Sequence, residues 1–181
     1  MVDAIGKIDL SRLRIVKYPD PVLRRACVEV AEFGEDLRAL AERMFALMYQ
    51  ARGVGLAAPQ VGVPVRLFVF NPTGEPGKDE GVCVNPRLLE REGVVVEEEG
   101  CLSLPNVTCK VKRFARVTLQ AQDLEGSVHE FRAGGLVARI FQHELDHLDG
   151  VLIIDRMSPV AKLANRRALR ELEAAYERAR S

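Results

Sequence analysis

The chain has 181 residues, of which 48% are hydrophobic and 29% are charged, and its 26 basic side chains balance its 26 acidic ones. This length suits one domain with a sizeable core, so we expect a single domain over residues 1–181, and the composition excludes a disordered chain. The zero net charge gives no reason to expect DNA as a partner. No apolar run approaches the ~20 residues that a membrane helix needs, and the N-terminal residues lack the features of a secretory or transit peptide. We therefore expect a cytoplasmic protein that binds neither DNA nor a membrane.

The first half of the chain contains one clear helix. Before it, Tyr18–Pro21 holds two prolines, which favour an extended or turning segment. From Glu35 to about Ala51, apolar residues recur at helical spacing and would bury one face of a helix. These residues are Leu37, Leu40, Met44, Leu47, Met48 and Ala51. Gly53 follows, where a glycine commonly ends a helix.

The middle of the chain has the short apolar runs and the alternation that predict β-strands. The expected strands are Val65–Phe70, Val94–Val96, Val107–Val111, Phe114–Gln122 and about Ser127–Arg132. Asn71–Gly81 has the composition of a loop, and Asp123–Gly126 that of a turn.

Two further helices are predicted towards the C-terminus. After Gly134-Gly135 the helical period returns and continues from Leu136 to Leu148. Ser158-Pro159 is typical of an N-cap with proline at the first helical position, so a last helix should run from there to Ser181. Because strands and helices come in separate runs, we expect an α+β fold with a mainly antiparallel sheet.

The strongest local signal for chemistry is the HExxH sequence His143–His147 in the predicted central helix. Two histidines four residues apart lie one turn apart on one face, so both rings can reach a single metal ion. Glu144 between them is placed to exchange a proton with a water molecule at that ion. The alternative is an ordinary amphipathic helix whose histidines lie on the surface or in the core.

A catalytic metal site needs a third protein ligand and one open position. No histidine follows His147, and the candidates before it are His129 and the cysteines, which are Cys27, Cys83, Cys101 and Cys109. None forms a CxxC pair, and we expect all four to be reduced. Cys101 stands out because a glycine precedes it and a proline follows soon after, which indicates a constrained loop or strand edge. The other three are expected to be small buried hydrophobic residues.

A glycine-punctuated loop, Gly53–Gly62, leaves the end of the first helix. Its small residues allow the backbone to approach a ligand closely, and Gln60 could donate an amide N–H to a developing oxyanion. A phosphate-binding loop is the alternative, but this loop lacks both GxGxxG and the Walker lysine, and it follows a helix instead of a strand.

Three segments in order, Gly53–Gln60 (GVGLAAPQ), Glu99–Leu104 (EGCLSL) and Gln142–His147 (QHELDH), resemble the signature motifs of peptide deformylases. The resemblance spans about Gly53 to Gly150, and the combination of all three motifs at plausible spacing is highly specific. It implies an antiparallel α+β fold around a central HExxH helix.

The resemblance also implies roles for individual residues. Cys101, His143 and His147 would be the metal ligands, with Glu144 as general acid and base. Gln60 and the backbone N–H of Leu102 would stabilise the oxyanion, and Gly55 would bind the substrate backbone.

The methionine side-chain pocket of the family would be lined here by Val54, Leu136 and Ile140, with Glu99 and Gly100 nearby. Arg139 departs from the bacterial pattern, which has an aliphatic residue there, and Leu136–Gln142 looks more like the organellar-type branch. We expect Arg139 to skirt the mouth of the pocket with its stem packed and its head in water. If it pointed inward, it would need a carboxylate partner or water.

The activity implied is hydrolysis of the N-formyl group of initiator formylmethionine on nascent peptides, releasing formate. The family resemblance implies Fe²⁺ as the metal, with Zn²⁺, Ni²⁺ or Co²⁺ as substitutes, whereas the ligand types alone suit both iron and zinc. An HExxH metalloprotease is the first alternative, and it lacks its downstream third ligand here. A catalytically silent relative is the second, and it would be expected to have lost Glu144, Gln60 or a ligand.

The C-terminal helix carries a basic excess that could dock on ribosomal RNA. Its basic residues are Lys162, Arg166, Arg167, Arg170, Arg178 and Arg180. The alternative is a solvated amphipathic helix that packs Leu163, Leu169 and Leu172. His129 lies outside every motif and is interpreted as structural.

Overall fold

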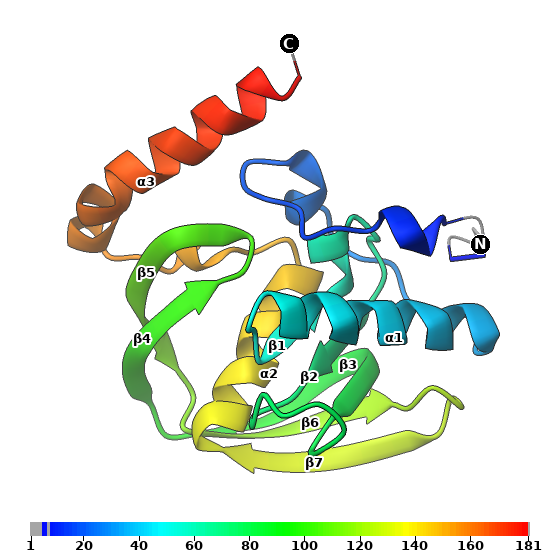
Figure 1. The fold of residues 1–181 in the computed structure, drawn as a ribbon. Coiled ribbons are helices and arrows are strands. Elements are labelled where there is room, and N and C mark those ends of the chain that lie inside the picture. The colour runs from blue at the N-terminus through cyan, green and yellow to red at the C-terminus, as the bar shows by residue number, and fades with distance from the viewer. Residues whose placement is uncertain (1–4, 7, 181) are drawn as a thin grey trace.

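Two antiparallel sheets frame a central helix in the computed structural model of the chain, which describes residues 5–6 and 8–180 (Figure 1). The main sheet has the strand order β1-β2-β3-β6-β7. Its strands are β1 Gly55–Ala57, β2 Leu67–Phe70, β3 Gly81–Glu92, β6 Arg116–Gln122 and β7 Val128–Gly134. The second sheet is the pair β4 Val95–Cys101 and β5 Leu104–Arg113. The helices are α1 Glu35–Gln50, α2 Gly135–Leu148 and α3 Pro159–Arg178, with short 3₁₀ turns at Leu10–Arg12, Pro21–Arg24, Ala58–Val61 and Ile153–Asp155. The expected α+β class is confirmed.

The first helix ends differently from the prediction. Arg52, with φ 56°, takes the left-handed position, and the N–H of Gly53 donates to the carbonyl of Met48 at 2.9 Å. This is a Schellman motif with arginine, not glycine, in the left-handed place. Gly53 is needed for another reason, because a Cβ there would lie 2.6 Å from Leu102 Cδ1. The glycine therefore lets the Leu102 side chain pack against the end of α1.

All five predicted strands are present, with shifted bounds. The short strand β1, which lies in the predicted loop Gly53–Gly62, was missed, and so was β3. Strand β3 is the longest strand of the main sheet and pairs with both β2 and β6. Asn85 (φ 49°) and Pro86 interrupt it where the register with β6 shifts, which destroys the period-two alternation. Its last residues are charged and exposed, so the sequence lacks the usual strand signal.

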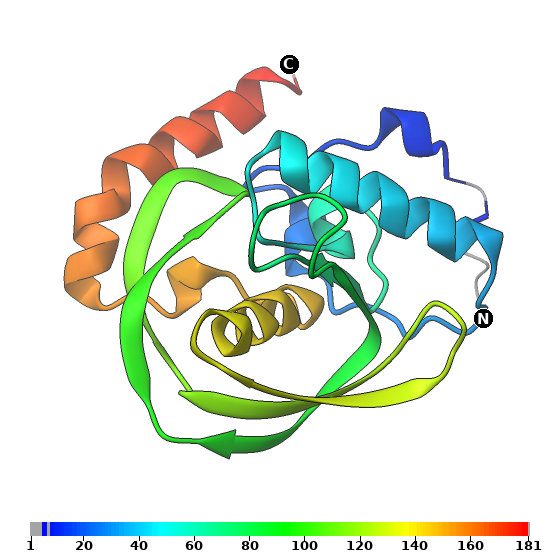
Figure 2. The same cartoon turned by 60° about the horizontal axis from the view of Figure 1, so that its bottom comes forward.

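Helix α2 lies in the middle of the molecule, between the main sheet and the β4–β5 pair (Figure 2). Ala138, Phe141, Leu145 and Leu148 recur at helical spacing and pack on the main sheet. Helix α1 packs its own apolar stripe on β1 and β2. The central place of the HExxH helix is therefore set by its apolar face.

Helix α3 lies on the outside, against β5 (Figure 1). It begins as predicted, with the Ser158 hydroxyl accepting from the N–H of Ala161 at 3.2 Å. It ends at Arg178, short of Ser181, which lies outside the described residues. Leu169 and Leu172 pack towards the core, but Leu163 is 69% exposed, so its predicted packing was wrong.

Within residues 5–6 and 8–180, no helix is both long enough and apolar enough to cross a membrane.

Candidate active site

One face of α2 packs on the sheet, and the adjacent face presents polar side chains to a cleft. Ile140, His143, Glu144 and His147 recur at helical spacing along that second face. Glu144 and His147 are buried, which would be unfavourable for polar groups without partners or a ligand.

The bend between the two strands of the smaller sheet brings a thiol to the histidines. The register of β4 and β5 shifts between Gly100 and Cys101. The Cys101 Sγ then lies 3.3 Å from His147 Nε2. One ligand atom from each of Cys101, His143 and His147 lies within 4.8 Å of the others. The three predicted ligands therefore meet at one point, although they come from two separate elements.

The ring of His143 is fixed from behind by a buried carboxylate. Its Nδ1 lies 3.0 Å from Glu99 Oε2, which leaves Nε2 to face the cluster. Burial opposes the charged ring, but the Cys101 sulfur, the Glu99 carboxylate and the nearby Glu144 raise the pKa of His143 well above its usual range. The pKa of His147 is lowered well below its usual range by burial and by His143. The Cys101, Glu99 and Glu144 groups therefore favour positive charge at the ring of His143.

Arg113 holds Glu99 in place through a bidentate ion pair, with both N–O distances 2.9 Å. A third nitrogen of the guanidinium lies 2.6 Å from Asp146 Oδ2 on α2. Although burial raises the pKa of Glu99, the hydrogen bonds from Arg113 and His143 outweigh it and lower the pKa to about 2. Glu99 is therefore a carboxylate at neutral pH, as an imidazole-orienting group should be.

Sequence reasoning missed Arg113, although a signal was present. On β5 the side chains of Val107, Cys109 and Val111 alternate inward, and Arg113 continues the same face. A charged residue on the buried face of a strand requires a buried partner of opposite charge. That partner is Glu99, which faces the interior from β4.

Glu144 lies against β1 and has one oxygen without a partner. Its side chain is buried, and no protein group hydrogen-bonds to its Oε2. Burial, together with the nearby Glu99 carboxylate, raises the pKa of Glu144 to about 7, against the opposing effect of His143. The close approach depends on Gly55, because a Cβ there would collide with Glu144 Oε1 and lie 3.0 Å from Ile140 Cγ2. A carboxyl group near pKa 7 with a free oxygen can both accept and donate a proton.

The side chain of Gln60 is held with its amide facing Cys101. Its Oε1 accepts from the Ala57 N–H at 2.8 Å, which fixes the orientation of the amide. Its Nε2 lies 3.5 Å from the Cys101 sulfur and 3.2 Å from the Ser103 hydroxyl. An N–H donor is thereby placed beside the ligand cluster.

A single cavity of about 420 Å³ joins these groups. Every predicted site residue lines it except His147, which is buried behind it. Those lining residues are Val54, Gly55, Gln60, Glu99, Gly100, Cys101, Leu102, Leu136, Arg139, Ile140, His143 and Glu144. His129 lies elsewhere, 2.7 Å from Asp123 at an exposed turn.

The guanidinium of Arg139 was expected to be surrounded by water, but it has a protein partner. The Arg139 side chain lines the cavity and its guanidinium forms an ion pair with Glu97 of β4, a half-exposed carboxylate. The pair therefore links α2 to β4 beside the cavity.

The cluster suits a divalent ion by its own chemistry. A thiol and two imidazoles are the ligand types of zinc and of ferrous iron. Glu144 Oε2 is buried without a protein partner, which fits a group that completes its bonding with bound water or ligand. The residues present therefore fit a metal site.

Comparison with known proteins identifies the family. The polypeptide deformylase family matches residues 12–163. The peptide deformylase of Acidobacterium capsulatum is 49% identical over 164 residues, covering 90% of this chain and 96% of that protein. The chloroplastic peptide deformylase 1B of rice is 46% identical over 167 residues, covering 91% of this chain and 62% of that protein.

Solved structures agree with the sequence comparison. A plant peptide deformylase superposes with a TM-score of 0.90 at 44% identity, and 93% of each chain is covered. The Plasmodium falciparum enzyme gives 0.90 at 41% identity, with 93% of this chain and 99% of that chain covered. The organellar-type branch stays a prediction, because bacterial and chloroplast relatives match at similar identities. The chain belongs to the peptide deformylases, metal-dependent hydrolases that remove the N-formyl group from nascent polypeptides.

Proposed function

We propose that the cavity beside α2 is the deformylation site and that its residues act in the roles expected from the sequence. The observation that supports this most directly is Glu144, a buried carboxyl group with a raised pKa and a free oxygen beside three potential metal ligands. Few arrangements other than a hydrolytic site would leave such a group without a protein partner.

Cys101, His143 and His147 would hold one divalent ion, and we propose Fe²⁺, with Zn²⁺, Ni²⁺ or Co²⁺ able to substitute. When bound, such an ion lowers the pKa of water and polarises a carbonyl group. Glu99 and Arg113 fix the His143 ring through its Nδ1, so its second nitrogen would be free to bind the ion.

The protein groups then move protons and stabilise charge. Glu144 takes a proton from the attacking water and later gives it to the leaving amine. Its pKa of about 7 suits both transfers near neutral pH. Gln60 Nε2 and the Leu102 N–H would donate to the oxygen of the formyl group as negative charge develops, and one such donor is worth about 3 kcal/mol. Gly55 would hydrogen-bond the substrate backbone.

The methionine side chain would occupy the apolar part of the cavity. Val54, Leu136 and Ile140 line this part, with Glu99 and Gly100 close by. Arg139, paired with Glu97, borders it at the mouth and would contact the substrate there. The pair presents a polar edge to residues that follow the methionine.

The test is anaerobic formate release from a formyl-Met tripeptide by iron-loaded protein. Glu144→Ala should lower kcat by about 10²–10⁴ while the metal content by mass spectrometry stays that of the parent. Glu130→Ala, a change at an exposed strand residue, is the control and should retain full activity. No formate from a fully metallated parent would contradict the proposal.

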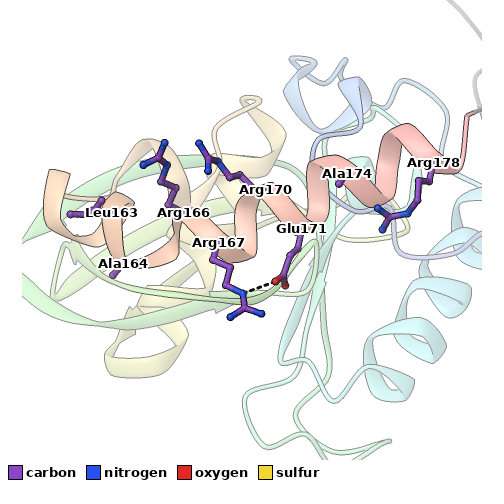
Figure 3. Close-up of a pocket in the computed structure, with 8 residues that line it drawn as sticks. All are labelled: Leu163, Ala164, Arg166, Arg167, Arg170, Glu171, Ala174 and Arg178. Carbon is purple, nitrogen blue, oxygen red and sulfur yellow. Dashed lines mark hydrogen bonds and ion pairs between the residues drawn. The ribbon is translucent and has the colours of Figure 1, made fainter.

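We further propose that α3 docks the enzyme on ribosomal RNA through its basic outer face (Figure 3). This face contains a surface groove of about 480 Å³ lined by Arg166, Arg167, Arg170 and Arg178 among others. Arg167 is paired with Glu171 at 2.8 Å, so the remaining arginines would supply most of the attraction. Ribosome cosedimentation should weaken when Arg166 and Arg170 become glutamate; unchanged cosedimentation would contradict docking.

The single catalytic domain is also part of the proposal. Its support is that the elements that carry the site draw on all three hydrophobic clusters. Leu102 packs on the first, α2 contributes Phe141 to the second, and Cys101 packs on the third. The cytoplasmic location stays a prediction.

A further inference from the structure

The extended residues before Pro19 contact both loops that carry the proposed oxyanion donors. The Val16 N–H donates to the carbonyl of Gln60 at 2.7 Å, and the Tyr18 N–H to the carbonyl of Ser103 at 2.9 Å. Between them, Lys17 Nζ donates to the carbonyl of Leu102 at 2.5 Å. Three consecutive residues therefore bind three points around the site, although they lie far from it in sequence.

Leu102 and Ser103 form the turn between β4 and β5, outside both strands. The strand register shifts immediately before this turn, between Gly100 and Cys101. The two peptide groups that flank the Leu102 Cα, one with its N–H and one with its carbonyl, are thus less constrained by the sheet than those within a regular ladder. Contacts from another segment have to fix them.

Lys17 is the charged member of these contacts. A hydrogen bond from an ammonium group to a carbonyl is shorter and stronger than one between neutral groups. Burial lowers the pKa of Lys17, while the nearby Cys101 sulfur raises it. Lys17 is an exposed residue, so this bond fixes its ammonium group at the Leu102 carbonyl, close to Cys101, instead of leaving it free in water.

We propose that Lys17 is a positioning residue for deformylation. It would hold Leu102 by its carbonyl, in the peptide group shared with Ser103, and so keep the N–H of the preceding peptide group directed to the oxygen of the formyl group. This rests on the proposed function, in which Leu102 and Gln60 are the oxyanion donors. Lys17 does not touch substrate and acts through Leu102. Val16 and Tyr18 make their bonds through backbone N–H groups, which a substitution leaves in place. Lys17 makes its bond through the side chain, so a substitution can remove it.

The kinetic test compares Lys17→Met with the parent and with Lys110→Met, a control at an exposed lysine of β5. We expect Lys17→Met to lower kcat about tenfold, less than the 10²–10³ for deleting a donor, because the donor remains but is less well oriented. KM should stay within about twofold, since a contact made in the transition state alone does not change substrate binding. Lys17→Arg, which keeps a cationic donor, should recover most of kcat.

A second measurement does not depend on activity. Amide exchange at Leu102, followed by NMR in the zinc-loaded protein, should become at least about fivefold faster in Lys17→Met and stay unchanged in Lys110→Met. Unchanged exchange would overturn the positioning role, whatever the rates. A second outcome would also overturn the positioning role. In it, Lys17→Met lowers kcat, raises KM and lowers the thermal midpoint, and Lys17→Arg does not restore kcat. That result would indicate a merely structural contact.

Gln60→Ala separates failure of this inference from failure of the proposed function. If Gln60→Ala lowers kcat and Lys17→Met does not, the oxyanion site stands and the inference about Lys17 is wrong. If the metallated parent releases no formate, the proposed function fails, and Leu102 exchange still decides whether Lys17 orders the turn.

Discussion

Helices α2 and α3 have similar amphipathic sequences but very different surroundings. Of the 14 residues of α2, eight are buried, among them Gln142, Glu144 and His147. None of the 20 residues of α3 is buried. An apolar stripe indicates which face of a helix packs, but not how deeply the helix is enclosed. Enclosure is what makes the polar residues of α2 informative, because each buried polar group needs a partner or a ligand.

The largest effect is expected where the buried polar residues of α2 would bind metal. His147→Ala removes a proposed ligand, so bound metal should fall from about one ion per chain to near zero and kcat/KM by more than about 10³. His129→Ala is the matched control, since that histidine pairs with Asp123 at an exposed turn. Metal content by mass spectrometry is the measurement, and retention of metal by the His147 variant would contradict the ligand assignment.

The ion pair behind His143 should dominate the acid stability of the protein. Because the pKa of Glu99 falls from 4.5 to about 2 on folding, its contribution is present above pH 4.5 and is lost as the pH falls towards 2. This corresponds to about 3 kcal/mol in the free energy of unfolding. Glu99→Gln should therefore destabilise the protein at pH 7 and flatten the decline between pH 4.5 and 2.

Urea unfolding at pH 7 and pH 3 measures this effect. Glu92→Gln is the control, because Glu92 pairs with Arg116 on the surface and should give the pH dependence of the parent. If the unfolding free energies of the Glu99 variant and the parent fell equally between pH 7 and pH 3, the buried Glu99–Arg113 pair would be excluded as the cause of the acid sensitivity.

Gln142 tests whether a buried polar residue of α2 can be purely structural. Its amide bonds the Phe114 N–H at 2.8 Å, the Phe114 carbonyl at 3.0 Å and the Ala138 carbonyl at 2.9 Å. Gln142→Leu should cost about 2 kcal/mol of unfolding free energy, because the Phe114 backbone groups lose their partners. Metal content should stay normal. Gln120→Leu, which loses a single 3.3 Å bond to exposed Glu130, should have a much smaller effect on the same urea curves.

The smallest effect is expected on α3. Leu163→Ser changes a side chain that is 69% exposed, so the unfolding free energy should move by less than about 0.5 kcal/mol. A clear loss of stability in urea would mean that this face of α3 is covered in solution. The difference in burial between α2 and α3 would then be smaller than the structure indicates.

The sequence predicted the elements with strong periods and the residues within motifs. The apolar stripe of α2 and the spacing of its two histidines needed no tertiary information. Strand β3 was not predictable in this way, because the bulge at Asn85 and Pro86 removes its alternation. The Schellman end of α1 was also missed, since a glycine nearby serves packing against Leu102 instead.

Long-range partners were the other limit. Neither the Glu99–Arg113 pair nor the contact of Lys17 with Leu102 follows from local pattern, because the partners are 14 and 85 residues apart. Alternation on β5 placed Arg113 on an inner face, but only the fold shows which carboxylate meets it. Arg139 is similar, since its partner Glu97 is 42 residues away.

The separation of the proposed metal ligands along the chain bears on the order of folding. The Cys101 sulfur and the His147 ring are 46 residues apart, and β5, β6 and β7 lie between them. Bringing such distant segments together requires closing a long loop, which proceeds more slowly than local helix formation. During synthesis, α2 could become helical soon after it emerges, yet the three ligands would meet only after the strands before it had paired. Metal uptake by a refolding chain should therefore lag behind the far-ultraviolet helix signal and report completion of the tertiary structure.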